Sequence, residues 1–251
     1  MSDIATVLQQ ARRSLVIARK DVRIYYAKGP VVIFGVLFPV FLFLSFTIGR
    51  HLSVDFMIPG LLGMILFFTA TSVSPIVIPW EAQARTLERL MSCPVKIETI
   101  IVGDILASFI FGLAISLVPI LIGLFLGITV LSPLIFTLAV ILAALCFASL
   151  GTVFSIPPTN LPSTVNMIAA VVKFPVVFIS GIFLPLDELP AWGQAIAYIS
   201  PLTYFTDIAR YSIQGRGHLP AVLDLLVLLG FTTLFLVVAM TLHQRTMPRR
   251  I

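Results

Sequence analysis

Three charged residues stand within or directly beside the long apolar stretches of this 251-residue chain, and charges in such places are the first candidates for chemistry. Lys173 lies near the middle of its stretch, whereas Asp104 and Asp224 lie near the ends of theirs. A lone lysine at the centre of a bilayer costs about 2.5–3.5 kcal/mol, so it is expected to face a bundle interior or a water-filled path. Two interpretations of Lys173 stay open, a contact for an anionic substrate and a structural ion pair with Asp104 or Asp224. For the two aspartates, solvation or pairing is favoured over proton transfer.

The other polar residues form no complete catalytic signature. His51 and Asp55 are one residue too close for the H-x-x-x-x-D of acyltransferases, and Gly103-Asp104 lacks the first glycine of the G-x-G-D of intramembrane proteases. No G-x-x-x-x-G-K-[ST] loop, which would cradle nucleotide phosphates, occurs in the sequence. The two cysteines suggest neither a disulfide scaffold nor a metal site. We therefore expect no catalytic residue, no metal ligand and no cofactor bound by this chain.

Six apolar stretches must position these charges. Hydrophobic residues make up 59% of the chain and charged residues only 11%, which is more apolar surface than a soluble domain of this size can bury. A bilayer-spanning helix needs about 20 apolar residues. The sequence predicts an all-α integral membrane protein with six transmembrane helices, at residues 31–48, 56–79, 105–128, 134–156, 165–186 and 222–242.

The basic residues predict the orientation. Twelve of the 16 Lys and Arg residues precede the first stretch, lie between the second and third, or follow the sixth. By the positive-inside rule, both termini are cytoplasmic. The net charge of +5 is then explained by topology and by contact with anionic lipid headgroups, so no nucleic-acid partner is predicted.

The leader, residues 1–29, predicts an amphipathic helix that lies in the membrane interface and ends at Gly29-Pro30. Two interpretations stay open, a topology anchor and a platform for a cytosolic partner. Its apolar stripe consists of Ile4, Leu8, Ala11, Leu15, Ala18, Val22 and Tyr25.

The longest loop on the cytoplasmic side predicts a second amphipathic helix over residues 81–93, which Pro94 ends. Glu81, Arg85 and Glu88 have the spacing of ion pairs on one face. An apolar strip lies on the other, and its residues are Ala84, Leu87, Leu90 and Met91. A helix of this kind suits docking against another protein.

The last outer segment, residues 187–219, predicts two short helices at 191–199 and 201–214 that dip into the outer leaflet. A seventh span in their place would put the C-terminus outside, against the distribution of charge. Asp207 and Arg210 are three residues apart, which predicts a salt bridge that fixes this turn.

Two sequence blocks carry a family resemblance. The first is A-R-T-L-E-R-L-M-S-C-P-V at residues 84–95. The second is S-G-I-F-L-P at 180–185, then L-P-A-W at 189–192 and P-L-T-Y at 201–204, followed by Asp207 and Arg210. With the leader and the six stretches, nearly the whole chain resembles the type-2 ABC exporter permease family.

The resemblance implies a permease subunit without catalytic activity of its own, in a prokaryotic plasma membrane. It would pair with a second permease subunit, identical or different, and with two copies of a cytosolic ABC ATPase that binds ATP and magnesium. The implied coupling positions are Arg85, Thr86, Leu87, Glu88, Leu90 and Pro94. The implied outer re-entrant positions are Gly181, Pro185, Trp192, Pro201, Tyr204, Asp207 and Arg210.

The chain departs from the family pattern at two places. The family often has glycine where this chain has Arg85, and Gly-Lys where it has Gly103-Asp104. These departures put the charge partners at the ATPase interface in doubt.

We therefore expect three parts: an interface helix at 1–29, a six-span permease domain at 30–244 and a tail at 245–251. The expected cargo is hydrophobic, amphipathic or lipid-linked, of the drug, antibiotic or polysaccharide type. Lys173 is a candidate for the translocation path. The alternative function is an ion-coupled secondary transporter or channel, although such proteins usually carry several charges within their spans.

Overall fold

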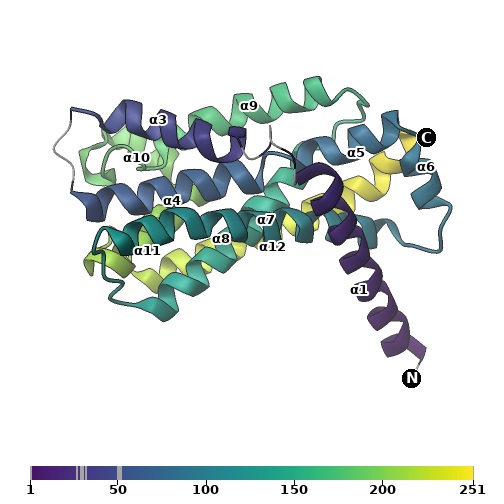
Figure 1. Cartoon of the computed structure of the whole chain (residues 1–251), viewed down its shortest axis with the longest axis horizontal. Helices are drawn as coiled ribbons and strands as arrows, with labels where there is room; N and C mark the ends of the chain where they lie inside the picture. The colour runs from purple at the N-terminus through teal and green to yellow at the C-terminus, as the bar shows by residue number, and fades with distance from the viewer. Residues whose placement is uncertain (1, 27, 29–30, 32, 50–52, 251) are drawn as a thin grey trace.

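The computed structural model describes residues 2–26, 28, 31, 33–49 and 53–250, and every regular element in this part of the chain is helical (Figure 1). The predicted turn at Gly29-Pro30 lies outside the described residues. In chain order the elements are α1 (Ser2–Asp21), η1 (Val22–Tyr26), η2 (Ile33–Leu37), α3 (Phe38–Thr47), α4 (Val54–Ala70), α5 (Ser74–Gln83), α6 (Thr86–Met91), α7 (Ile97–Phe125), α8 (Pro133–Phe154), α9 (Pro162–Ile179), η3 (Leu186–Glu188), α10 (Ala191–Ala197), α11 (Pro201–Gln214), α12 (Ala221–Thr246) and η4 (Met247–Arg250).

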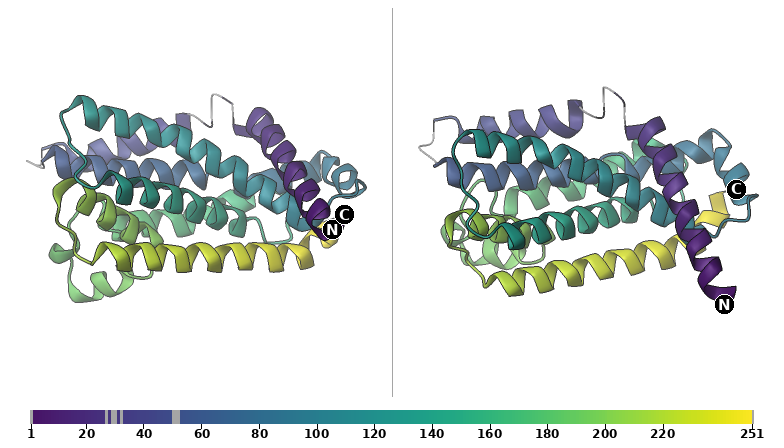
Figure 2. Two further views of the ribbon diagram at one scale, coloured as in Figure 1. Left: turned by 90° about the horizontal axis from the view of Figure 1, so that it is seen from below. Right: turned by 60° about the horizontal axis from the view of Figure 1, so that its bottom comes forward.

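The long helices lie side by side in one bundle, and α1 crosses one end of it obliquely (Figures 1 and 2). That end also holds α6 and both termini, and we call it the terminal end. The other end, which holds α10 and α11, is called the opposite end. Both termini therefore lie at the same end of the bundle, as the charge distribution predicted, while the side of the membrane that they face stays a prediction.

Five helical stretches of the described chain are long and apolar enough to cross a membrane. They are Val54–Gln83, Ile97–Phe125, Pro133–Phe154, Pro162–Ile179 and Ala221–Thr246. The first predicted span corresponds to a shorter apolar helix, Gly35–Thr47. The all-α membrane class is thus confirmed and the count of six spans is not. The tail predicted at 245–251 begins inside α12, which continues to Thr246.

The second span is broken in the middle, between α4 and α5. Pro75 explains the break, because proline has no N–H and its ring clashes with the carbonyl four residues earlier, which here belongs to Thr71. The ammonium of Lys173, in the neighbouring α9, donates a hydrogen bond to that carbonyl. A residue from another span therefore satisfies the backbone group that the proline leaves without a partner.

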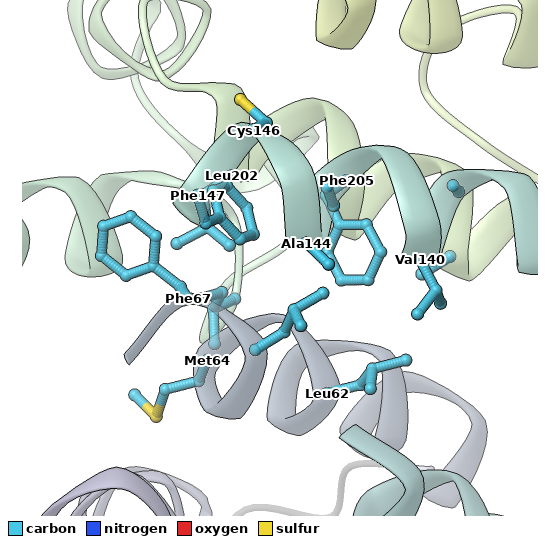
Figure 3. Close-up of a cluster of buried hydrophobic side chains, with 14 of the residues drawn as sticks. Leu62, Met64, Phe67, Val140, Ala144, Cys146, Phe147, Leu202 and Phe205 are labelled. Atoms are coloured by element: carbon cyan, nitrogen blue, oxygen red, sulfur yellow. The ribbon is translucent and has the colours of Figure 1, made fainter. Parts of the chain in front are cut away.

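The main core lies where α4, α8 and α11 meet (Figure 3). Phe67 of α4 and Phe147 of α8 form an edge-to-face pair with ring centroids 5.2 Å apart, and Phe205 of α11 lies 6.2 Å from Phe147. Nearly every residue of α11 is buried. The helix predicted to dip into the outer leaflet is thus an internal element of the bundle.

Candidate functional site

At the terminal end, α1 is docked on α7 through a face that the sequence pattern identified only in part, at Ala18. Ser14, Ile17 and Ala18 are buried, whereas Leu8 and Leu15 of the predicted stripe are 72% and 57% exposed. The predicted stripe is therefore wrong for these two leucines. Gly103 of α7 explains the choice of face, because a Cβ there would lie 2.6 Å from Cγ2 of Ile17.

Polar contacts reinforce this docking. Thr99 Oγ1 donates to Oε1 of Gln10 at 2.7 Å, and the guanidinium of Arg13 donates to the carbonyl of Pro94. Through these two contacts, α1 is tied to the start of α7 and to the loop that follows α6.

An ion-pair cluster joins α1 to α5. The ammonium of Lys20 pairs with the buried carboxylate of Glu81 and, at 3.0 Å, with that of Asp21. The predicted Glu81–Arg85 pair is thus wrong, because Glu81 faces α1. Burial raises the pKa of Asp21 to about 6, although Lys20 opposes the shift.

The predicted helix over 81–93 is interrupted at Arg85, so only α6 remains of it as a separate helix. Arg85 has φ 55°, the left-handed conformation that glycine adopts without strain. The glycine that the family resemblance implies at this position would adopt this conformation without strain. Thr86 Oγ1 donates to the carbonyl of Glu81 at 3.2 Å, which holds the two helices together across the break.

The side chains of α6 divide as the amphipathic pattern predicted. Leu87 is buried in the hydrophobic cluster that also contains Ile17, and Leu90 is half-buried against the same cluster. Glu88 is exposed, as is Pro94 in the loop beyond. The coupling role of these residues stays a proposal.

Asp104 and Asp224 are buried rather than solvated, contrary to the first of the two expectations. Asp104 accepts hydrogen bonds from Ser74 at 3.0 Å and from Thr152 at 3.4 Å. Ser74 lies on α5 and Thr152 on α8, both far from Asp104 in the chain, so the sequence alone could not predict these partners.

Lys173 forms no ion pair with Asp104 or Asp224, so that interpretation is wrong. Its partners are the Thr71 carbonyl and the ring of Phe154, whose centroid lies 6.0 Å from Nζ. Lys173 also lines a cavity of about 510 Å³ between α5, α9 and α3, where Trp80, Asn166 and Phe174 are among its neighbours.

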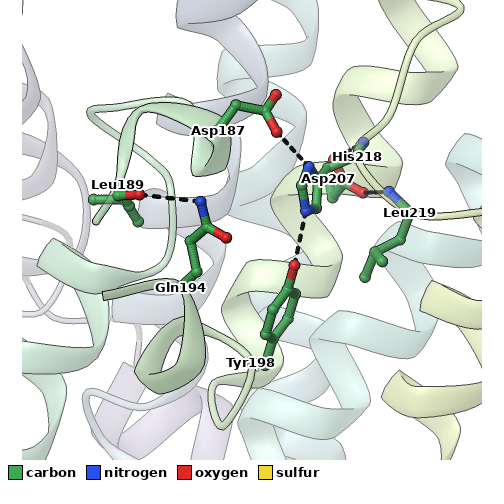
Figure 4. A network of polar contacts seen from close by, with 7 residues as sticks. All are labelled: Asp187, Leu189, Gln194, Tyr198, Asp207, His218 and Leu219. Atoms are coloured by element: carbon green, nitrogen blue, oxygen red, sulfur yellow. Dashed lines mark hydrogen bonds and ion pairs between the residues drawn. The ribbon is translucent and has the colours of Figure 1, made fainter. Parts of the chain in front are cut away.

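At the opposite end, the predicted Asp207–Arg210 salt bridge is wrong as well. The carboxylate of Asp207 accepts from the backbone N–H of His218 and of Leu219, each at 2.8 Å (Figure 4). Arg210 instead donates to the carbonyl of Gly181 at 2.6 Å and lies 4.0 Å over the ring of Phe56. Each residue does fix a turn, but by binding backbone.

The other predicted outer residues gather around these turns. Gly181 has φ 72° at the end of α9, and Pro201 opens α11. Tyr204 donates its hydroxyl to the carbonyl of Tyr198 at 2.8 Å. Trp192 is 69% exposed on α10. Helix 201–214 was predicted with the observed bounds, whereas helix 191–199 ends two residues early, at Ala197.

Sequence reasoning missed the histidine that joins this region together. Nδ1 of His218 lies 2.6 Å from the carboxylate of Asp187, and Nε2 lies 2.7 Å from the hydroxyl of Tyr198 (Figure 4). Its two ring nitrogens thus connect the loop before α12 to η3 and α10. Its position in a Gly- and Arg-rich loop gave no periodic signal.

The structure thus combines a helical bundle, a docked amphipathic helix, a short helix at the same end and a cavity between spans. Residues 11–213 match the ABC-2 type transporter family, and the chain belongs to it. It is 26% identical over 194 residues to the inner membrane transport permease YadH of Escherichia coli, covering 76% of this chain and 75% of that protein.

The alignments with two further relatives cover a smaller share of the relative's length. The putative transport permease ycf38 of Porphyra purpurea is 32% identical over 196 residues, which cover 72% of this chain and 62% of the relative. The probable multidrug ABC transporter permease YbhS of Escherichia coli is 23% identical over 189 residues, which cover 74% and 50%.

Proposed function

We propose that this chain is the membrane subunit of an ATP-driven exporter, without catalytic activity of its own. Two copies of a cytosolic ABC ATPase, carrying ATP and magnesium, would bind the terminal end, and a second permease subunit, identical or different, would complete the transporter. The complex would sit in a prokaryotic plasma membrane with both termini cytoplasmic. The cargo would be hydrophobic, amphipathic or lipid-linked, as the name of the multidrug relative also suggests.

The observation that carries this proposal is the placement of α6. Leu87 anchors it on the cluster shared by α1 and α7, while Glu88 and the half-buried Leu90 remain within reach of a partner. The Glu81 carbonyl holds it to α5 through Thr86. A force applied to α6 therefore reaches both the second and the third span, which is what ATP-driven coupling requires.

At the opposite end, α10 and α11 would form the re-entrant pair that lines the exit, with Gly181, Pro185 and Arg210 fixing its turns. The cavity beside Lys173 would be part of the translocation path. Two observations support these proposed roles: the cavity lies between spans, and the turns lie at the end of the bundle away from α6.

Purification of the tagged chain from its native membranes in mild detergent tests the proposal. We expect a stoichiometric soluble subunit that carries a P-loop, and its loss in Glu88→Lys and Leu90→Ala variants. Glu188→Lys, which changes an exposed carboxylate at the opposite end, is the matched control and should retain the subunit. Solute or ion movement by the chain alone, without ATP, would instead establish the secondary transporter.

A further inference from the structure

The cavity beside Lys173 has a chemistry that selects its occupant. Its volume of about 510 Å³ lies in the range of small-molecule sites. Most of its wall is apolar, with the aromatic rings of Phe38, Phe68, Trp80 and Phe174. Among the described residues that line it, Lys173 carries the only charge, and none is acidic.

The ammonium of Lys173 has bonding capacity left over. It is buried, and among the described residues its one hydrogen-bond acceptor is the Thr71 carbonyl. An ammonium has three donors, so two remain for a ligand. No carboxylate of the described chain lies within ion-pair distance of it. A buried cation without a counter-ion favours an anion in the adjoining space.

We propose that this cavity binds an anionic amphiphile. The acidic headgroup, a phosphate, sulfate or carboxylate, pairs with Lys173, and the apolar chain lies along the aromatic wall. A cationic amphiphile is repelled there, and a neutral one leaves the ammonium without a counter-ion. This inference rests on the proposed function, because it names the class of cargo that the exporter moves.

The position of Trp80 makes the proposal measurable. The sequence has two tryptophans, and the other, Trp192, is 69% exposed at the opposite end. In a Trp192→Phe background, Trp80 is the one tryptophan left, and excitation at a wavelength that tyrosine does not absorb reports on it alone. The full-length chain in phosphatidylcholine nanodiscs is titrated with lysophosphatidate and with lysophosphatidylcholine that carry the same brominated acyl chain, since bromine quenches a tryptophan in contact with it.

We expect lysophosphatidate to quench Trp80 at a concentration at least tenfold lower than lysophosphatidylcholine. Lys173→Gln should abolish the difference, because glutamine can still donate to the Thr71 carbonyl but carries no charge. Lys96→Gln removes an exposed cation at the terminal end and should preserve the difference. Inorganic phosphate at the same concentrations should leave the quenching unchanged.

Equal quenching by the two lipids in the chain that retains Lys173 would overturn the proposal. This test needs no substitution of the lysine, so it does not depend on whether a variant folds. A difference that persists in Lys173→Gln would overturn the role of Lys173. Displacement by inorganic phosphate would assign the site to a free anion in place of an amphiphile. The titration contains no ATPase, so a negative result in it would not contradict the ATP-driven function. Conversely, failure to recover an ATPase in the purification would not contradict lipid binding in this cavity.

Discussion

The two ends of the bundle use charged residues in opposite ways. At the opposite end, Asp207 and Arg210 bind backbone N–H and C=O groups of neighbouring turns. At the terminal end, Lys20 pairs with the carboxylate of Asp21, its neighbour in α1, and with that of Glu81 in α5. Both clusters contain buried carboxylates, but only in the second does an ion pair between side chains join two helices.

The difference distinguishes a rigid region from one that can move. We call Asp207 and Arg210 with their backbone partners the scaffold, and the ion-pair cluster of Lys20, Asp21 and Glu81 the joint. A charge bonded to backbone keeps a loop in one conformation, because every rearrangement leaves a buried polar group without a partner. An ion pair between two helices is one contact that can break and re-form when the helices move. The terminal end, where α6 lies, is therefore the end suited to motion, and the following substitutions test that contrast.

The largest effect is expected at Asp207. Asp207→Ala removes two hydrogen bonds to a charged acceptor, each worth about 1.5–3 kcal/mol, so the free energy of unfolding should fall by about 3–6 kcal/mol. Asp207→Asn keeps one accepting oxygen and should lose about half as much. Denaturant unfolding in detergent measures the loss, and hydrogen exchange should show release of the His218 and Leu219 amides. A small, equal effect of both variants would show that the Asp207 carboxylate does not hold this loop in place.

The joint should respond to pH through Asp21. Its pKa is about 6 in the folded chain against an ordinary value of 3.8, so folding favours the protonated form. Stability from this group is complete below about pH 4 and is lost as the pH rises through 6, to a maximum of about 3 kcal/mol.

Unfolding measured between pH 4 and 7 checks this expectation. Asp21→Asn should flatten the profile, whereas Glu188→Gln, at an exposed carboxylate of the opposite end, should leave the slope in place. Lys20 and Glu81 face Asp21. A slope that survives in Asp21→Asn would show that Asp21 is not the titrating group.

The docking of α1 should depend on the absence of a side chain at Gly103. Gly103→Val places atoms against Ile17 and the Ser14 carbonyl, an overpacking that costs about 1–3 kcal/mol. Gly230→Val is the control, because a Cβ there meets nothing within 4 Å. Protease cleavage within α1 should accelerate in the first variant alone. Equal cleavage in both would show that α1 is not held by this contact.

The sequence predicted most helices because apolar length is a local property. Helix 201–214 has its predicted bounds, and α8 lies within two residues of its predicted span. The break after Ala70 was missed, although Pro75 was visible, because an apolar run of 24 residues hides a bend whose freed carbonyl is satisfied from another span.

The partners of charged residues were not predictable in the same way. Sequence spacing suggested Glu81 with Arg85 and Asp207 with Arg210, since residues three or four apart are neighbours on a helix. Glu81 instead faces Lys20, 61 positions away, and Arg210 binds Gly181, 29 positions away. Burial selects the partner here, and burial is set by packing between helices that spacing alone does not describe.

The smallest effect is expected at Arg85, whose left-handed backbone strains the turn between α5 and α6. Arg85→Gly should stabilise the chain by about 0.5–1 kcal/mol, because left-handed backbone costs a residue with a Cβ about 1–2 kcal/mol and the greater freedom of glycine when unfolded offsets part of the gain. Arg85→Ala keeps the Cβ and should leave stability unchanged, since the Arg85 side chain is exposed. Thermal unfolding of the two variants measures the difference. If alanine and glycine gave the same midpoint, the turn between α5 and α6 would not be strained.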